Sequence, residues 1–175
     1  QVVVDIGGTS IRLGWQSQKA EDVRNPVTYA CRDFATPVDA LRQYCDQNQL
    51  KVDRVVLAVA AEISGPEVNI TNNHWIFNAG ELARELGANE YLLINDFTAQ
   101  ALAQADPSAH GNMLLIDGMS ATQAPLLVIG PGTGLGVSAL VPAGGDYLPL
   151  EGEGGHGELR EEEEGRSRRR VEQRA

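Results

Sequence analysis

The sequence predicts a mixed α/β protein. Short β-branched runs alternate with segments whose apolar residues have helical spacing, and glycines follow several of the runs. Three expected strands come first, and helices and strands alternate after them, which is the pattern of a mixed sheet with covering helices. With 175 residues, of which 42% are hydrophobic and 22% charged, the chain can bury a core without disulfides or metals.

The first three expected strands form a meander. Residues 2–6 are a β-branched run that ends in Gly7-Gly8, as expected of a buried strand that enters a turn. Residues 11–15 and 27–29 are the next two strands. Pro26 places the third strand at an edge of the sheet or delays its start, because proline lacks the amide that a central strand needs.

The middle of the chain continues with a helix, a strand and a hairpin. Thr36 is expected to cap a helix that has Pro37 at its first position. Residues 54–60 are almost all apolar, which indicates a fully buried strand. Residues 63–70 are expected to form a hairpin that turns at Gly65-Pro66.

The second half alternates helices with strands. Residues 79–86 are expected to form a helix that Gly87 ends. A second helix is expected at 97–105, and Asp96 before it is a natural N-cap. Further strands are expected at 91–94, 114–116, 126–129, 137–141 and 147–150.

The net charge of −10 comes from one part of the chain. Residues 1–157 carry 18 acidic and 8 basic side chains, whereas residues 158–175 carry 6 of each. The acidic body argues against nucleic acid and anionic membranes as partners, since both need a positive face. The tail, residues 158–175, has like-charge blocks and is expected to be solvated and atypical, because four glutamates stand beside its arginines.

Cysteine content and hydropathy argue against disulfide-rich, zinc-binding and membrane-spanning classes of protein. Cys31 and Cys45 are expected to be reduced and buried, because two cysteines make neither a disulfide framework nor a four-ligand zinc site. No run approaches the roughly 18 apolar residues of a membrane span. No signal peptide is visible, so a cytoplasmic location is the default expectation.

Two glycine-rich stretches suggest phosphate binding. In Asp5-Ile6-Gly7-Gly8-Thr9-Ser10 the turn brings backbone N–H groups together, and the strand-terminal Asp5 suits a hydrated Mg²⁺. Residues 130–136 hold four glycines at alternate positions, which indicates close approach to a ligand or another backbone, with a plain hairpin turn as the alternative. Neither a Walker loop nor a Rossmann fingerprint fits.

Three polar stretches suggest a second substrate. Asp96, at a strand-to-helix junction, can act as a general base if it is not simply a cap. Glu153 and His156 stand in a glycine-rich loop that can wrap a polar ligand, and two such residues are weak evidence for a metal. Residues 71–77 place asparagines beside Trp75, which suits a sugar ring but also suits a capped turn over core aromatics.

Taken together and in order, these motifs resemble a bacterial glucokinase of the hexokinase-like, non-ROK group. The segments that match are D-I-G-G-T, T-N-x-x-W-x-F, I-N-D-F-T-A, G-x-G-T-G-L-G and G-E-G-G-H, which begin at residues 5, 71, 94, 130 and 152. The resemblance implies an actin-like ATPase (ribonuclease H-like) fold. It implies a small lobe over 1–108 and the start of a large lobe over 109–157, whereas the composition of residues 158–175 predicts a charged, atypical and disordered tail.

The resemblance also implies the roles of the site residues. Asp96 would be the general base on the 6-hydroxyl of glucose, with ATP and Mg²⁺ as the phosphate donor and its metal. The glucose-binding residues would be Asn72, Asn95, Asp96, Glu153 and His156. Those near the ATP phosphates would be Val4, Asp5, Ile6, Gly7, Gly8, Thr9, Gly132, Thr133 and Gly134, with Asp5 reaching Mg²⁺ through water.

Some features depart from the family or leave its function open. Ser10 stands where the family usually has Asn. The family continues well beyond residue 157, so the adenosine pocket and a further sugar-binding glutamate are not expected in this chain, and a homodimer is an expectation for the full-length family only. Two alternatives to a glucokinase remain: a sugar-binding fragment that cannot turn over, and a non-kinase ATPase or regulator with the same fold.

Overall fold

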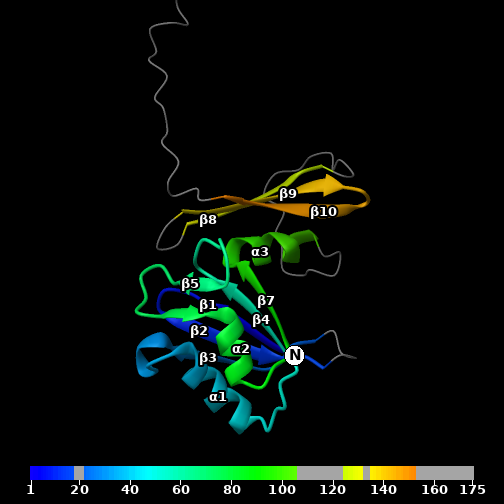
Figure 1. Cartoon of the computed structure of the whole chain (residues 1–175). Helices are drawn as coiled ribbons and strands as arrows, with labels where there is room; N and C mark the ends of the chain where they lie inside the picture. Colours follow the sequence, from blue (N-terminus) through cyan, green and yellow to red (C-terminus); the bar gives the residue numbers. More distant parts are fainter. Residues whose placement is uncertain (18–21, 106–123, 132–134, 153–175) are drawn as a thin grey trace, which may run out of the picture.

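The computed structural model describes residues 1–17, 22–105, 124–131 and 135–152. A five-stranded sheet with two helices forms one body, and a three-stranded sheet with a third helix beneath it forms the other (Figure 1). The short β5–β6 ribbon belongs to the first body.

The five-stranded sheet has the strand order β3-β2-β1-β4-β7. Its central strand β1 pairs antiparallel with β2 and parallel with β4. The predicted meander is confirmed, and Pro26 lies within the edge strand, where its missing amide costs no sheet hydrogen bond. The strands are β1 (Val2–Ile6), β2 (Ser10–Trp15), β3 (Arg24–Ala30), β4 (Arg54–Val59) and β7 (Glu90–Asn95).

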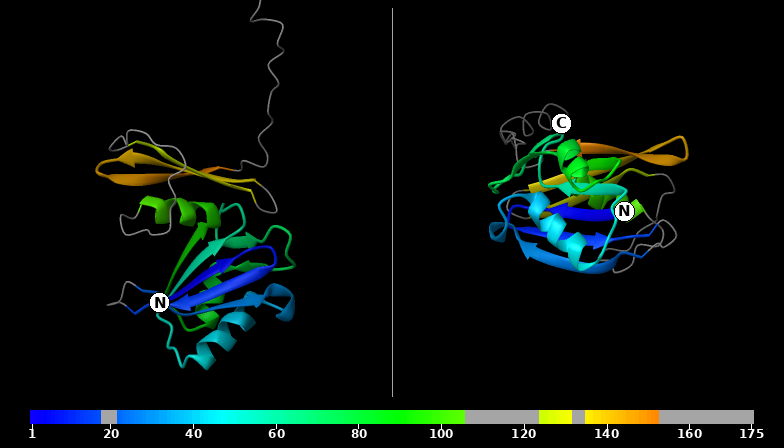
Figure 2. Two further views of the ribbon diagram at one scale, coloured as in Figure 1. Left: turned by 180° about the vertical axis from the view of Figure 1, so that it is seen from behind. Right: turned by 60° about the horizontal axis from the view of Figure 1, so that its bottom comes forward.

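Two helices lie side by side on one face of this sheet (Figure 2). The predicted cap of α1 (Pro37–Gln47) is confirmed, since the Thr36 hydroxyl accepts from the Asp39 amide. Asn78 caps α2 (Ala79–Glu85) in the same way. The core between helices and sheet is formed by Val4, Ile6, Leu41, Tyr44, Leu57, Val59, Trp75 and Leu82.

The hairpin predicted for residues 63–70 is wrong. Strand β5 (Glu67–Asn69) pairs instead with β6 (Ile76–Asn78), so the connection runs through residues 70–75. The cause is Trp75, which is 1% exposed and whose indole Nε1 donates to Phe34 O at 3.3 Å. Burial of that large ring fixes the loop at this place, whereas Gly65 and Pro66 lie exposed before the strand.

Helix α3 (Asp96–Ala105) packs against the second sheet, which consists of β8 (Leu126–Pro131), β9 (Leu135–Ala143) and β10 (Asp146–Gly152). These antiparallel strands confirm the expected ones, and Gly144 and Gly145 supply the positive φ angles of 62° and 92° at the β9–β10 turn. The strand expected at 114–116 lies outside the described residues.

The two faces of this second sheet differ. Side chains facing α3 are half-buried or buried, among them Leu126, Val128, Ser138 and Leu140. The opposite face presents large apolar side chains to solvent: Leu127, Ile129, Leu135, Leu148 and Leu150, each 45–62% exposed. Among the described helices, none is long and apolar enough to cross a membrane.

Candidate functional site

The predicted motifs of the first body meet at one edge of the five-stranded sheet. Strands β1, β4 and β7 are parallel, and their last residues, Ile6, Val59 and Asn95, are in register. The Gly7–Thr9 turn and Asp96 therefore follow strand ends on the same edge of the sheet, with the end of β4 between them. In α/β sheets this carboxyl edge is where ligands bind.

The turn after β1 offers hydrogen-bond donors at this edge. The Gly7 amide closes the turn by donating to Ser10 O at 2.9 Å. Within the described part of the chain, the amides of Gly8 and Thr9 have no hydrogen-bond partner, and the Thr9 side chain is exposed. Consecutive backbone N–H groups of this kind, next to a hydroxyl, suit a phosphate.

The loop of residues 71–74 packs directly against that turn. A Cβ added to Gly8 would lie 3.0 Å from Thr71 O, so the turn needs glycine to approach this loop. Asn73 Nδ2 donates to Gly7 O at 3.3 Å, and the Thr71 amide donates to Ala60 O at 3.1 Å. These hydrogen bonds hold the loop against the turn and against Ala60, the residue that follows β4.

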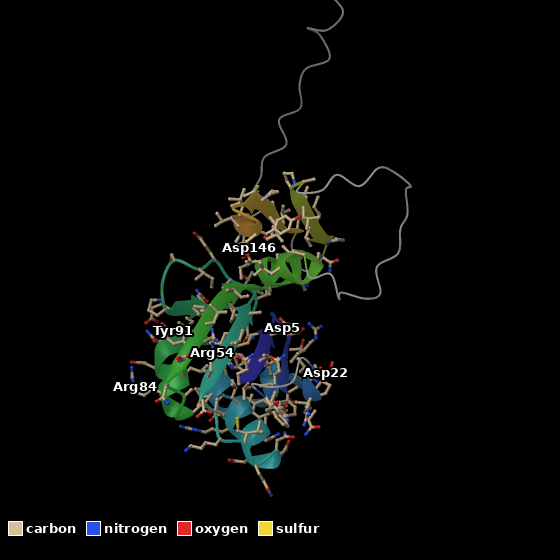
Figure 3. All side chains as sticks on the ribbon, turned by 90° about the vertical axis from the view of Figure 1, so that its right-hand side faces the viewer. Asp5, Asp22, Arg54, Arg84, Tyr91 and Asp146 are labelled. Carbon is tan, nitrogen blue, oxygen red and sulfur yellow. The ribbon has the colours of Figure 1, made fainter. Side chains whose placement is uncertain are left out.

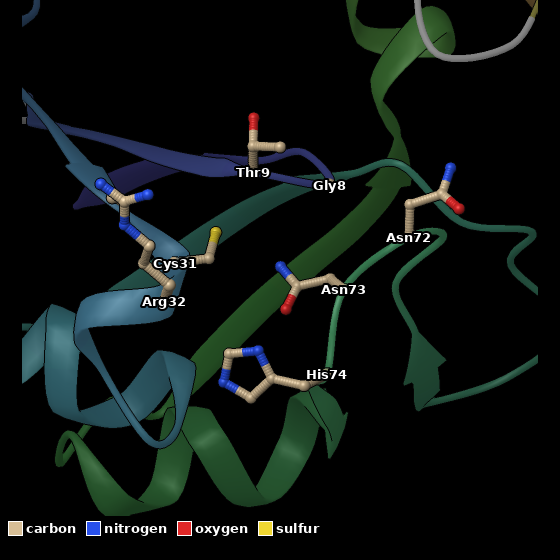
Figure 4. Close-up of a pocket in the computed structure, with 8 residues that line it drawn as sticks. Gly8, Thr9, Cys31, Arg32, Asn72, Asn73 and His74 are labelled. Atoms are coloured by element: carbon tan, nitrogen blue, oxygen red, sulfur yellow. The ribbon is translucent and has the colours of Figure 1, made fainter.

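A pocket of about 730 Å³ opens between the turn, the end of β3 and this loop (Figure 4). Its lining includes Thr9, Cys31, Arg32, Asn72 and His74. Burial raises the pKa of the Cys31 thiol, so the thiol stays protonated at neutral pH. The Arg32 side chain is 90% exposed and lies 3.8 Å from the Asp33 carboxylate, so it can turn toward an anion in the pocket.

Asn95 and Asp96 lie at the junction between β7 and α3. Asn95 Oδ1 accepts from the amides of Phe97 at 2.9 Å and Thr98 at 3.1 Å, and Nδ2 donates to Ala61 O at 3.3 Å. The sequence suggested Asp96 as the cap of α3, but the Thr98 amide donates to Asn95, because β7 extends one residue further than expected. Asp96 Oδ1 shares only the Phe97 amide, at 2.9 Å. Asn95 keeps one Nδ2 hydrogen for a ligand.

Asp5 lies in β1 (Figure 3). Its carboxylate accepts from Arg12 Nη1 at 2.6 Å. Arg12 is directly opposite Asp5 in the β1–β2 register, and both side chains are partly exposed. The carboxylate predicted to face Mg²⁺ is therefore already neutralised by a cation. Val4 and Ile6, on alternate positions of the same strand, are buried in the core and can approach a ligand only through their backbones.

The other predicted site residues, Gly132, Thr133, Gly134, Glu153 and His156, lie outside the described residues. Two of the four glycines in the 130–136 stretch are described, and each faces the Phe97 ring rather than open space. In the described part of the chain, no three His, Cys, Asp or Glu side chains are grouped to hold a metal ion.

Comparison with known proteins decides the family. A family model described as Glucokinase matches residues 2–169. This chain belongs to the glucokinase family. Among its relatives, the glucokinase of Campylobacter jejuni subsp. doylei is 40% identical over 159 residues, and that of Neisseria meningitidis serogroup C is 39% identical over 158 residues. The alignments cover 89% of this chain but only 47% and 48% of those glucokinases, so the chain spans about half their length.

Solved glucokinases have the same fold over the same extent. The crystal structure of a glucokinase from an Antarctic psychrotroph matches with a TM-score of 0.79 and 30% identity, over 93% of this chain and 52% of that one. A Balamuthia mandrillaris glucokinase in complex with glucose matches with a TM-score of 0.65 and 22% identity, over 99% and 52%. The predicted α/β, actin-like fold is confirmed.

Sequence reasoning missed three residues of this edge. Arg12 was within reach of prediction, because a hairpin that turns at residues 7–10 places position 12 opposite position 5. Arg32 gave no such signal, and Asn73 stood in the predicted 71–77 stretch without a role of its own. Their place depends on where β3 ends and on the loop around Trp75, and both are set by tertiary packing.

Proposed function

We propose that this chain carries the glucose-binding and phosphate-binding edge of a glucokinase, which transfers the terminal phosphate of ATP to the 6-hydroxyl of glucose. The observation that carries the proposal is the convergence of three motifs at the in-register ends of β1, β4 and β7. The Gly8 and Thr9 amides lie after β1, the 71–74 loop packs against them, and Asp96 follows β7.

Asp96 acts as the general base in this proposal. It occupies the first turn of α3, where the positive end of a 10-residue helix stabilises a carboxylate. The capping hydrogen bond from the Thr98 amide goes to Asn95 Oδ1, whereas the Phe97 amide is shared between Asn95 Oδ1 and Asp96 Oδ1, each at 2.9 Å. The carboxylate orients the 6-hydroxyl and accepts its proton as the phosphate is transferred.

The remaining sugar hydroxyls are met by polar groups around Asp96. Asn95 has one Nδ2 hydrogen to offer, and Asn72 is exposed beside the pocket. The family resemblance adds Glu153 and His156. A site in which several polar groups pair with hydroxyls rejects analogues that lack them, because the protein groups would then be left unpaired.

On the phosphate side, the amides of Gly8 and Thr9, which have no hydrogen-bond partner among the described residues, fit an anion. The family resemblance adds Gly132, Thr133 and Gly134 to this side. Mg²⁺, when bound, supplies charge neutralisation at the transferred phosphate. The carboxylate that the sequence suggested for it, Asp5, is paired with Arg12, so we assign Asp5 no catalytic step.

The test is ATP-dependent formation of glucose 6-phosphate by this chain, with Asp96→Asn and Asp96→Ala. Both substitutions should lower kcat by at least about a hundredfold, as removal of a positioned base does. Asp46→Asn is the matched control, because Asp46 is an exposed carboxylate on α1 and should leave the rate unchanged. Turnover that survives Asp96→Ala would contradict the role of Asp96.

A second candidate is a sugar-binding chain without turnover. It is favoured by the exposed apolar face of the second sheet, since a large uncovered patch marks a surface that normally packs against something else. We propose that the remainder of a large lobe covers this face in the complete enzyme, with the lobe beginning near residue 109. Calorimetry that detects glucose binding, together with no glucose 6-phosphate from ATP, would select this candidate.

A further inference from the structure

Two glycines of the 130–136 stretch lie opposite each other and face one aromatic ring. Gly130 and Gly136 are paired in the β8–β9 register. A Cβ on Gly130 would lie 2.7 Å from Cζ of Phe97, and a Cβ on Gly136 would overlap the ring atoms Cδ2, Cε2 and Cζ. The ring therefore occupies the space where both side chains would stand.

The pairs of residues that face α3 become smaller along the sheet. Leu126 pairs with Leu140, Val128 with Ser138, and Gly130 with Gly136. Side chains thus fill the space beneath the sheet at one end, and the ring of Phe97 fills it at the other. Glycine weakens a strand relative to alanine, so two opposed glycines need such a packing reason.

The ring joins the two halves of the proposed reaction centre. Phe97 directly follows Asp96, and its amide is held by Asn95 Oδ1 at 2.9 Å, so its backbone is fixed at the end of β7. Gly130 and Gly136 flank the loop that holds residues 132–134. A displacement of the ring would therefore move Asp96 relative to Gly130 and Gly136.

We propose that Phe97 is a positioning residue, whose ring on the Gly130–Gly136 pair sets the position of Asp96 relative to the paired ends of β8 and β9. The proposal rests on the proposed function for the role of Asp96. It changes the interpretation of the glycines: Gly130 and Gly136 are small to admit an aromatic ring, whereas the sequence suggested approach to a ligand or another backbone.

The contact itself is tested first, by NMR on this chain. An aromatic ring over a glycine shields its α-protons, so the Hα signals of Gly130 and Gly136 should lie upfield and return to ordinary positions in Phe97→Leu. In Phe97→Tyr the upfield shifts of the two glycines should be only partly kept, because a hydroxyl on Cζ would point at Gly130. Unshifted glycine signals in the unsubstituted chain would overturn the inference.

The positioning role is tested by moving the ring. Gly136→Ala should shift the side-chain carboxyl carbon signal of Asp96, and adding Phe97→Leu should return that signal toward its original position, because the smaller side chain admits the new methyl group. Gly65→Ala is the matched control, since nothing lies within 4 Å of a Cβ there. An Asp96 signal that ignores Gly136→Ala, with the ring contact present, would overturn the proposal.

Kinetics separate this inference from the proposed function. Gly136→Ala should lower kcat for glucose phosphorylation about tenfold or more, while the KM for glucose changes less than about threefold, because misplacing a base by a fraction of an ångström affects the chemical step most. A chain without turnover would fail the proposed function, and the NMR signals would still decide the role of Phe97.

Discussion

Arg12 and Asp5 lie directly opposite each other on β2 and β1, and Arg12 Nη1 donates to Asp5 Oδ2 at 2.6 Å. Asp5 is the residue before Ile6, which ends β1. The glycine turn follows Ile6. Asp5 was predicted to reach Mg²⁺ through water, so Arg12 and a metal ion would compete for one carboxylate. The strength of that competition can be measured.

Replacing Arg12 by Gln should have a small effect on folding and a larger one on metal binding. Both side chains are partly exposed, so the loss of the pair should lower the free energy of unfolding by less than about 1 kcal/mol in urea titrations. With its cation removed, Asp5 should show stronger Mn²⁺ broadening of its NMR signals. Arg54→Gln is the control, because it removes a distant exposed cation and should leave that broadening unchanged. Broadening in Arg12→Gln equal to that of the unsubstituted chain would show that Asp5 does not bind the metal.

The two glycines of the first turn should respond differently to alanine. A Cβ at Gly8 would lie 3.0 Å from the backbone oxygen of Thr71, which has little freedom to move, so Gly8→Ala should cost about 1–3 kcal/mol. At Gly7 the nearest atom would be 3.7 Å away, and Gly7→Ala should be neutral or stabilise by up to about 1 kcal/mol. Urea unfolding of both variants measures the difference, and equal losses would show that the Gly8–Thr71 contact is not tight.

Most of the sheet could be predicted because its signals are local. The β-branched run of β1, the apolar run of β4 and the Thr36–Pro37 helix start each depend on a few adjacent residues. The site motifs were found for the same reason, since a strand followed by glycines or by an Asn–Asp pair is visible in sequence. Their meeting at one edge follows from parallel pairing, which the sequence pattern implies.

What could not be predicted depends on side chains that are distant in sequence. The β5–β6 connection is set by Trp75 against Phe34, forty-one residues apart. The role of Asn95 as cap depended on the exact end of β7, and local propensity favours either Asn or Asp at a cap. The partner of Gly130 and Gly136 is Phe97, on a different element, so the glycine pattern alone suggested a ligand.

Loss of the Asn95 cap should loosen the first turn of α3. Asn95→Ala removes the side-chain acceptor for the Thr98 amide, one of the two acceptors for the Phe97 amide and the donor to Ala61 O, and should lower the free energy of unfolding by about 1–2 kcal/mol. Amide hydrogen exchange should rise at Thr98 before it rises in β4. Asn95→Asp keeps the acceptor and loses only the donor, so its loss should be smaller. Equal losses in the two variants would mean that the tie to Ala61, and not the cap, holds this junction.

Buried Cys45 predicts how stability depends on alkaline pH. Burial first, and then the nearby Asp46 charge, raise the pKa of the Cys45 thiol from 9.0 to about 11. The folded protein therefore holds this proton more tightly than the unfolded chain does. Below pH 9 both states are protonated and the contribution to stability is complete. As the pH rises from about 9 to 11 the unfolded chain loses its proton first, so stability falls, by at most about 3 kcal/mol from this group.

Urea midpoints at pH 8 and pH 10.5 measure that fall. Cys45→Ala removes the titrating thiol and should have a smaller difference between the two midpoints than the unsubstituted chain, even though it leaves a small cavity beside α1 at both pH values. Some alkaline loss should remain in the variant, because burial also raises the pKa of Tyr44 and of Cys31. An unchanged difference in Cys45→Ala would assign the alkaline loss to those two groups instead.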